Sequence, residues 1–368
     1  MTDPRMNNLA RILVHYSAKV KPKDRVCIVA QPTAAPLILE VYREVLNAGG
    51  FPHSLITIDG LEYLFFAQAN DEQLQYVSPF TKMVYEEFEA MIGIGSQSNT
   101  RALSNIDPSR QSLRAKSHTD ITKVFLERGA AKELKWVWTI YPTQAYAQDA
   151  EMSLSEFEEY VYSTTFADTD DPVAEWQKIH DGQQTLVDWL VGKKHVEVKG
   201  PDVDLTLSIE GRTFENCDGE NNMPDGEIFT GPVEDSVNGW VRFSYPAIQR
   251  GLEVEGIELH FEEGKVVKAS AKKNEDFLLK MLDTDPGARY LGEFAIGTNE
   301  RINRFIKEIL FDEKIGGTIH MAMGSGYPET GSVNESAIHM DMICDMRDGG
   351  QIFVDGELIY ESGEFKIK

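Results

Sequence analysis

A histidine and an aspartate stand two residues apart in the segment SAIHMDMI, as His339 and Asp341. Residues two apart in a β-strand lie on the same face, so these two side chains would project together. The other face of the strand would carry Ile338, Met340 and Met342. Burying an imidazole and a carboxylate without partners is costly, and a metal ion would satisfy both. A hydrogen-bonded His–Asp pair is the simpler interpretation of this pattern taken alone.

A second segment, GGTIHMAMGSGYP, places His320 inside an apolar strand and follows it with a glycine-rich turn that ends at Tyr327. Glycine lets the backbone approach a ligand closely, and a tyrosine hydroxyl at that point could donate to a developing negative charge. A histidine satisfied in the core and an aromatic residue at the rim of a loop are the structural alternatives.

Three glutamates complete the candidate set. Glu293 is a single charge in the apolar run ARYLGEFAIG, and Glu227 follows a Pro-Asp-Gly turn at the start of a predicted strand. Glu313 in FDEKIGG is a weaker candidate, because charges at a helix end near Lys314 are commonly solvated. Two histidines and several carboxylates from separate strands match a two-metal centre, which activates a water molecule as the nucleophile. These ligand types favour zinc, cobalt or manganese.

The elements that must position these residues follow from the pattern along the chain. Residues 1–165 alternate amphipathic helices with short β-branched runs, which predicts a doubly wound α/β domain with a mostly parallel sheet. A helix-favouring stretch covers residues 73–88. The predicted strands are RVCIVAQ (25–31), FPHSLITI (51–58), AMIGIG (90–95) and KWVWTIYP (135–142).

Residues 166–368 have a different character. A long helical stretch over 170–193 is followed by short alternating strands that are separated by turns such as Gly200-Pro201. This pattern predicts an α+β domain built on a strongly curved, mostly antiparallel sheet that carries the candidate metal site. NERINRFIKEIL (299–310) is predicted as a helix that interrupts the strands.

The composition narrows the class of protein. The chain has 36 basic and 60 acidic residues and a formal charge of −24, which argues against nucleic acid and anionic membranes as partners. No apolar run reaches the roughly 18 residues of a spanning helix, and we expect no signal peptide. Cys27, Cys217 and Cys344 are too far apart in sequence to suggest a disulfide scaffold or a cysteine zinc site. We therefore expect a cytoplasmic protein of two domains.

Four segments taken in order resemble the successive motifs of the thermophilic aminopeptidases of the aminopeptidase T, AmpS and PepS types. They are MPDGEIFTGPVEDSVNG, YLGEFAIGTNERI, DEKIGGTIHMAMGSGYP and ESAIHMDMICD. LVHYSAKVKPKDRVCIVA and WTIYPTQAYAQDAEMS are also similar, so the resemblance covers nearly the whole chain. It implies an α/β N-terminal domain, a C-terminal metal domain, a homodimer, two divalent metal ions, and peptide substrates with a free N-terminus.

The resemblance also implies roles for individual residues. It makes Tyr327 catalytic and Glu313 a candidate acid or base. The hypothesis is that a water activated by two metals attacks the peptide carbonyl, Tyr327 stabilises the oxyanion, and Glu313 moves a proton to the leaving amine. The implied metal ligands are Glu227, Glu293, His320, His339 and Asp341, with Glu293 as the bridge. The chain departs from the family pattern in that Glu313 lies seven residues before His320.

Two alternatives stay open at this point. His320, His339 and Asp341 alone would make the triad of a mononuclear Fe(II) enzyme, and some relatives of these aminopeptidases resemble dioxygenases that open dihydroxypyridine rings. Glu227 and Glu293 favour a second metal instead. The other alternative is a non-catalytic small-molecule binding protein, in which GIGSQSN touches a ligand at the switch point of the parallel sheet. That segment matches neither a dinucleotide fingerprint nor a Walker loop.

Overall fold

The computed structural model describes residues 3–249 and 252–367. The chain divides into two compact units, one of Met1–Trp176 and Gly219–Pro224 and one of Gln177–Asp218 and Asp225–Lys368. The sequence predicts a domain boundary after residue 165, and the division between the two compact units falls within helix α10 (Pro172–Leu190). Trp176 ties the first turns of this helix to the first unit, because its buried indole donates a hydrogen bond of 2.9 Å to the carbonyl of Thr165.

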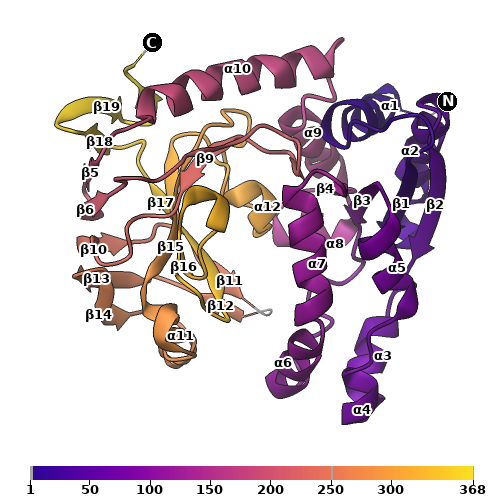
Figure 1. Cartoon of the computed structure of the whole chain (residues 1–368), viewed down its shortest axis with the longest axis horizontal. Coiled ribbons are helices and arrows are strands. Elements are labelled where there is room, and N and C mark those ends of the chain that lie inside the picture. Colours follow the sequence, from indigo (N-terminus) through magenta and orange to yellow (C-terminus); the bar gives the residue numbers. More distant parts are fainter. Residues whose placement is uncertain (1–2, 250–251, 368) are drawn as a thin grey trace. The chain divides into compact units, whose positions relative to one another are not determined.

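The first unit is built on a parallel sheet with the strand order β2-β1-β3-β4-β8 (Figure 1). From β1 the chain moves to β2 at one edge and then to β3 and β4 on the other side, so the winding direction reverses between β1 and β3. This arrangement agrees with the α/β fold predicted for this part of the chain. The strands are β1 (Arg25–Ala30), β2 (Phe51–Ile56), β3 (Ala90–Gly95), β4 (Lys135–Ile140) and β8 (Asn222–Met223).

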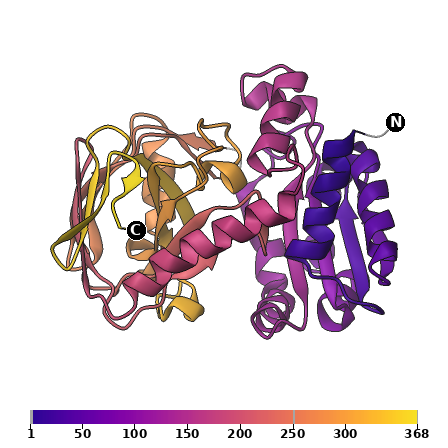
Figure 2. The ribbon, with the colours of Figure 1, turned by 90° about the horizontal axis from the view of Figure 1, so that it is seen from above.

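Helices lie on both sides of this sheet (Figure 2). On one face, Cys27 and Met91 pack against Val84 and Phe88 in an apolar cluster at α5, and α2 contacts β1 and β2. The helices are α1 (Pro4–Arg11), the π-helix η1 (Ile12–Ser17), the 3-10 helix η2 (Pro32–Ala34), α2 (Ala35–Asn47), α3 (Leu61–Gln68), α4 (Asp71–Leu74), α5 (Pro79–Glu87), α6 (Pro108–Ser117), α7 (Thr119–Ala130), α8 (Gln144–Asp149) and α9 (Leu154–Thr164).

The helix-favouring stretch 73–88 is divided between two helices. α4 ends at Leu74, and α5 begins at Pro79 with Ser78 as its N-cap. The hydroxyl of Ser78 accepts the N–H of Phe80. Proline fits the first turn of a helix but not its interior, because it has no N–H to donate. The prediction of helix is therefore wrong for the residues between α4 and α5.

The second unit holds two antiparallel sheets and a short β11-β12 pair instead of one curved sheet (Figure 1). Apolar residues from both sheets, such as Leu205 on one and Met340 on the other, belong to one core. Each sheet has an apolar face that must be buried, and two sheets solve this by covering one another. The antiparallel pairing itself agrees with the prediction.

The eight-stranded sheet has the order β14-β13-β10-β6-β5-β18-β19-β20, and the five-stranded sheet has the order β17-β16-β15-β9-β7. The strands are β5 (His195–Gly200), β6 (Val203–Ser208), β7 (Glu215–Cys217), β9 (Glu227–Thr230), β10 (Asn238–Arg242), β11 (Ala247–Gln249), β12 (Leu252–Val254), β13 (Glu258–Glu262), β14 (Lys265–Ser270), β15 (Leu291–Gly297), β16 (Thr318–Gly324), β17 (His339–Asp345), β18 (Gln351–Val354), β19 (Glu357–Glu361) and β20 (Glu364–Phe365). The helices other than α10 are α11 (Glu275–Leu282), η3 (Pro286–Arg289), α12 (Ile309–Asp312) and η4 (Pro328–Thr330).

The predicted helix over 299–310 is wrong for most of its length, since only α12 forms there. The side chain of Asn299 donates to the carbonyl of Asp225, and the N–H of Ile306 donates to Asp312. Lys307 has a φ of 65°, which an α-helix excludes. Ile302 and Ile306 are nevertheless buried, so the apolar spacing that suggested a helix serves the packing of an irregular segment.

No helix within residues 3–249 and 252–367 is long and apolar enough to cross a membrane. The three cysteines are free thiols. Cys344 is fully buried in the core of the second unit, as the alternation of β17 predicts.

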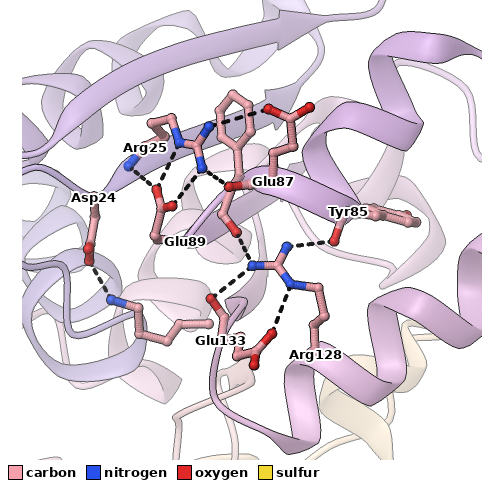
Figure 3. Close-up of polar contacts among 9 residues, drawn as sticks. Asp24, Arg25, Tyr85, Glu87, Glu89, Arg128 and Glu133 are labelled. Carbon is pink, nitrogen blue, oxygen red and sulfur yellow. Dashed lines mark hydrogen bonds and ion pairs between the residues drawn. The ribbon is translucent and has the colours of Figure 1, made fainter.

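Arginine side chains join the N-terminal ends of the parallel strands (Figure 3). The guanidinium of Arg25 donates to Glu89 at 2.7 and 3.1 Å, and the backbone N–H of Arg25 donates to the same carboxylate at 2.7 Å. Arg128 of α7 donates to the carbonyls of Tyr85 and Phe88 at 2.7 and 3.0 Å. The hydrogen bonds from Arg25 lower the pKa of Glu89 to about 2.

The Glu89→Gln variant should lose about 1 kcal/mol of unfolding free energy at neutral pH. The pKa shift alone would suggest about 3 kcal/mol, but the carboxylate is 34% exposed, and solvent screens the pair. Because the folded-state pKa is depressed, this stabilisation is present above pH 4.5 and is lost as the pH falls toward 2. The difference in urea midpoint between variant and wild type should therefore be largest at pH 7 and smaller at pH 3.

Glu87→Gln is the matched control for this measurement. Glu87 lies 3.4 Å from the same guanidinium and is 58% exposed, so its loss should change stability by less than about 0.5 kcal/mol. An equal loss in both variants would contradict the assignment of the stabilising contact to Glu89.

Candidate metal centre

One face of the five-stranded sheet gathers the candidate ligands. The antiparallel register places Ala322 of β16 opposite Glu293 of β15 on one side and opposite Asp341 of β17 on the other. His320 precedes Ala322 by two residues, and His339 precedes Asp341 by two, so both histidines share the face of this row. The pairing of three strands thus brings together residues that are far apart in sequence.

Glu227 reaches the same face from β9. It pairs with Gly297, which lies an even number of residues after Glu293 on β15 and therefore has the same orientation. The buried amide of Gln183, on α10, donates to the carbonyls of Glu227 and Cys217 at 3.0 Å each. Gln183 fixes the backbone at the start of β9, and the sequence patterns did not single it out.

A β-bulge directs Glu293 toward the other ligands. The register between β15 and β16 shifts between Leu291 and Glu293, at Gly292. A Cβ at Gly292 would lie 2.3 Å from the carbonyl oxygen of Ser325, so only glycine fits there. The bulge and this close contact together fix the position of β15 and the direction of the Glu293 side chain.

The opposite face of these strands is apolar. Met321, Met323, Met340 and Met342 all lie in the core of the second unit. These methionines are therefore packing residues of the core.

The ligand atoms form two groups that share Glu293. Nε2 of His320 lies 3.3 Å from Glu293 Oε1 and 3.2 Å from Glu227 Oε2. Nε2 of His339 lies 3.3 Å from Glu293 Oε2 and 3.3 Å from Asp341 Oδ1. Within each group the ligand atoms all lie within 4.8 Å of one another. The two oxygens of Glu293 face different histidines, which is the arrangement of a carboxylate that could bridge two cations.

The hydrogen bonding of these groups fits metal ions. Glu227 Oε2 and His320 Nδ1 are buried and have no hydrogen-bond partner among the described residues. Nδ1 of His339 lies 2.9 Å from the carbonyl of Ser325, which can only accept. Nε2 of His339 is therefore the nitrogen that remains to face Glu293 and Asp341. A histidine oriented by a backbone carbonyl and aimed at carboxylate oxygens is typical of a metal ligand.

The pKa values show that this cluster requires positive charge. Burial favours the neutral imidazoles, but the carboxylates outweigh it and raise the pKa of His339 to about 11 and that of His320 to about 9. Burial would also raise the pKa of Glu293, yet the two histidines lower it to about 2. At Glu227, burial dominates and raises the pKa to about 8. Without a metal, protons on the histidines supply the charge that the carboxylates require.

Glu313 lies near residues of both ligand groups, and Lys314 lies beside the first. A carboxylate oxygen of Glu313 lies within 4.8 Å of ligand atoms of His320 and Asp341. Burial raises the pKa of Glu313. The side chain of Lys314 is completely buried, pairs with Glu313 and lies 3.3 Å from Glu227 Oε1.

The expectation that charges near Lys314 are solvated is therefore wrong. After α12 the chain turns inward and packs tightly. The closeness is shown at Gly316, where a Cβ would lie 2.8 Å from Cα of Glu300. The signal in the sequence was the pair Gly316-Gly317 directly after the charges, which permits such close packing.

Tyr327 lies at the end of the glycine-rich turn and borders the second ligand group. Its ring packs edge-on against His339 and Phe229, with centroids 5.3 and 5.2 Å apart. Tyr327 is 37% exposed, but desolvation around its ring and the nearby carboxylates raise its pKa, so the hydroxyl stays protonated and able to donate. Glu234 fixes the loop that follows, because it accepts the N–H of Val333 at 2.8 Å.

The sequence pattern of the thermophilic metalloprotease (M29) family matches residues 2–365 of this chain. The chain belongs to this family. It is therefore a peptide-bond hydrolase of a metal-using family, and the family resemblance seen in the sequence is confirmed.

Curated relatives agree with this assignment. Aminopeptidase 2 of Geobacillus stearothermophilus is 26% identical over 99% of this chain and 98% of its own length. Aminopeptidase T of Thermus thermophilus is 31% identical over 73% of this chain and 72% of its own length.

Two solved structures share the fold. Wild-type AmpT from Thermus thermophilus matches with a TM-score of 0.86 at 22% identity and covers 99% of both chains. The 2,5-dihydroxypyridine dioxygenase from Pseudomonas putida KT2440 matches with a TM-score of 0.61 at 13% identity, over 99% of this chain and 97% of its own. At these identities the likeness concerns the fold alone.

Substitution of Glu293 should weaken the binding of two metal ions, whereas substitution of Glu227 should weaken the binding of one. Glu293 belongs to both ligand groups and Glu227 to the first. Zinc titration of the metal-free protein should give two bound ions in the wild type. We expect Glu227→Gln to lower the affinity of one ion by at least about tenfold and Glu293→Gln to lower both.

Glu255→Gln serves as the control, because Glu255 pairs with the half-exposed Lys273 at the surface of the same unit. Retention of two tightly bound ions by Glu293→Gln would contradict the shared role of this carboxylate.

Proposed function

We propose that this protein is a cytoplasmic aminopeptidase that removes N-terminal residues from peptides with two divalent metal ions. The observation that carries the proposal is the position of Glu293, because one of its carboxylate oxygens faces His320 and the other faces His339. The aminopeptidase names of the relatives support release of N-terminal residues in particular. The free cysteines agree with a reducing compartment.

The proposed metal ligands form the two groups described above. Glu227, Glu293 and His320 would hold one ion, and Glu293, His339 and Asp341 the other. Bound there, two divalent ions would polarise the peptide carbonyl and lower the pKa of a coordinated water toward neutrality. The mixture of imidazole and carboxylate ligands favours zinc, cobalt or manganese.

Two residues would then act on the substrate directly. Tyr327 keeps its proton and borders His339, so its hydroxyl can donate a hydrogen bond to the oxygen of the attacked carbonyl. Glu313 is buried and has a raised pKa, which suits a group that takes a proton and passes it to the leaving amine. The free amine of a peptide N-terminus could coordinate one of the two ions.

The dioxygenase alternative would use only His320, His339 and Asp341. Here Glu293 lies 3.3 Å from both histidines, so a single iron at the triad would leave this buried carboxylate without a cation of its own. The small-molecule alternative concerned the segment after β3, where the backbone N–H of Ser96 donates to the side chain of Gln31. Nothing observed there favours a ligand over this contact.

An aminoacyl arylamide with a free amine should be hydrolysed, and its N-acetylated counterpart should not, because an acetylated nitrogen could not coordinate a metal ion as a free amine could. Chelation should abolish turnover, and zinc, cobalt or manganese should restore it. Glu293→Gln should reduce kcat/KM by more than about a thousandfold while the far-UV circular dichroism stays unchanged.

Iron as the metal that restores activity, together with cleavage of a dihydroxypyridine, would favour the dioxygenase. Full activity after complete chelation would contradict both metal-dependent functions.

We also propose that two copies of the chain associate through β2. This edge strand is exposed at five of its six residues, and it pairs only with β1 among the described strands. Phe51 is 54% exposed, and Leu39 and Leu46 on the outer face of the adjoining α2 are 65% and 55% exposed. An uncovered edge strand can pair with its own copy about a two-fold axis, and apolar patches of this kind mark interfaces.

The double variant Phe51→Lys/Leu55→Lys should be a monomer in sedimentation equilibrium, whereas the wild type should be a dimer. Lysines on an edge strand prevent pairing with another strand. Val267→Lys is the control, because Val267 is 51% exposed on the eight-stranded sheet. Dimers of equal stability in all three proteins would exclude β2 as the interface.

A further inference from the structure

Lys314 is a fully buried cation beside the candidate metal centre. Its side chain is 0% exposed. Its ammonium pairs with Glu313 and lies 3.3 Å from Glu227 Oε1 and 3.9 Å from Asp225 Oδ1. A buried ammonium is tolerated where carboxylates replace its lost hydration. The proposed reaction makes no use of this lysine, so its position requires another explanation.

The two oxygens of Glu227 have different neighbours. Oε1 faces the ammonium of Lys314, whereas Oε2 lies 3.2 Å from Nε2 of His320 and has no hydrogen-bond partner among the described residues. The lysine therefore holds one oxygen and leaves the other to a cation shared with His320. Partners that orient a ligand in this way commonly change metal affinity by about 10- to 100-fold.

The same ammonium also holds Glu313. The carboxylate of Glu313 lies near His320 and Asp341, where a substrate bound to the metals would react. A proton-transfer group acts only within hydrogen-bond reach of its target, so its direction matters. One lysine thus sets the orientation of a candidate ligand and of the candidate acid or base.

The formal charges of the centre balance only when the lysine is counted. Two divalent ions bring four positive charges, and Lys314 brings the fifth. The carboxylates that these charges meet are Asp225, Glu227, Glu293, Glu313 and Asp341, five in all. The centre as a whole is then neutral in the buried face of the sheet.

We propose that Lys314 is a positioning residue that fixes Glu227 as a one-oxygen metal ligand and aims Glu313 at the substrate. This inference rests on the proposed two-metal function. It also explains why the neighbouring group of Cys217, Asp225 and Glu227, whose ligand atoms lie within 4.8 Å of one another, need not hold a third metal. The ammonium of Lys314 already lies against the two carboxylates of that group.

The test compares Lys314→Met, which keeps the length of the side chain without its charge, with Lys314→Arg, which keeps the charge. Zinc affinities of the metal-free full-length proteins are measured by competition with a chromogenic chelator. We expect Lys314→Met to bind one of the two ions about 10- to 100-fold more weakly and the other within about threefold of wild type. Lys314→Arg should recover part of the loss.

Turnover of an aminoacyl arylamide at saturating zinc gives a second measurement. Lys314→Met should lower kcat by at least about tenfold with KM changed by less than about threefold, because a misdirected Glu313 affects the transition state and not substrate binding. Lys273→Met is the matched control, since Lys273 pairs with Glu253 and Glu255 at the surface of the same unit. Its affinities and kcat should equal those of wild type.

The outcomes separate this inference from the proposed function. A wild-type protein that binds one ion, or that hydrolyses no arylamide, overturns the two-metal aminopeptidase. A wild type with two ions and a Lys314→Met variant with unchanged affinities and kcat overturns the role of Lys314 alone. A Lys314→Met variant that equals wild type, together with a defective Lys314→Arg variant, would likewise show that the residue only fills space.

Should Lys314→Met fail to fold, as judged by circular dichroism, the double variant Asp225→Asn/Lys314→Met replaces it. This variant removes one charge of each sign but still releases Glu227 Oε1. Weaker binding of one ion is expected here too, and two ions bound as tightly as in wild type would overturn the inference.

Discussion

The burial of several carboxylates on one face of one sheet is the constraint on which the rest of the second unit depends. Glu227 and Glu293 are 5% and 4% exposed, and His320 between them is 1% exposed. Such a concentration of negative charge is unstable in a protein interior unless cations lie within it. The raised pKa values of His320 and His339 show the same demand, because both imidazoles would hold protons until a metal displaced them.

The surrounding structure serves to keep these groups in place. The apolar side of the same strands is packed with methionines and other core residues, which makes the sheet a rigid base. The bulge at Gly292 and the amide of Gln183 fix the strands that carry the candidate ligands, and the buried ammonium of Lys314 contacts Glu227. Candidate ligands that are held in this way would be oriented before a metal binds.

The fold by itself does not define the reaction. The structures of AmpT and of a 2,5-dihydroxypyridine dioxygenase share this architecture with the chain, at TM-scores of 0.86 and 0.61. The side chains of the site, and not the fold, therefore distinguish the two reactions. His320, His339 and Asp341 would suit either chemistry, whereas Glu227 and Glu293 give the face enough negative charge for a second divalent ion. Glu227 and Glu293 therefore favour the two-metal aminopeptidase over the mononuclear dioxygenase.

The sequence by itself determined the alternating helix and strand pattern of the first unit, the ordered family motifs, and the residues most able to bind metal. It could do so because strand alternation and residue chemistry are local: a two-residue spacing puts His339 and Asp341 on one face whatever the partner strands are. It missed the break at Pro79 and misjudged 299–310, where long-range contacts of Asn299 and Ile306 override an apolar spacing that suits a helix.

Only the tertiary structure decided which ligands meet. The register of β9, β15, β16 and β17 gives each oxygen of Glu293 its own histidine, and register depends on pairing between distant strands. The tertiary structure also decided that the antiparallel strands form two sheets around one core. Lys314 was invisible in the sequence as part of the site, because a lysine at a helix end is usually solvated. Its burial follows from the inward turn after α12, which the pair Gly316-Gly317 permits but does not by itself specify.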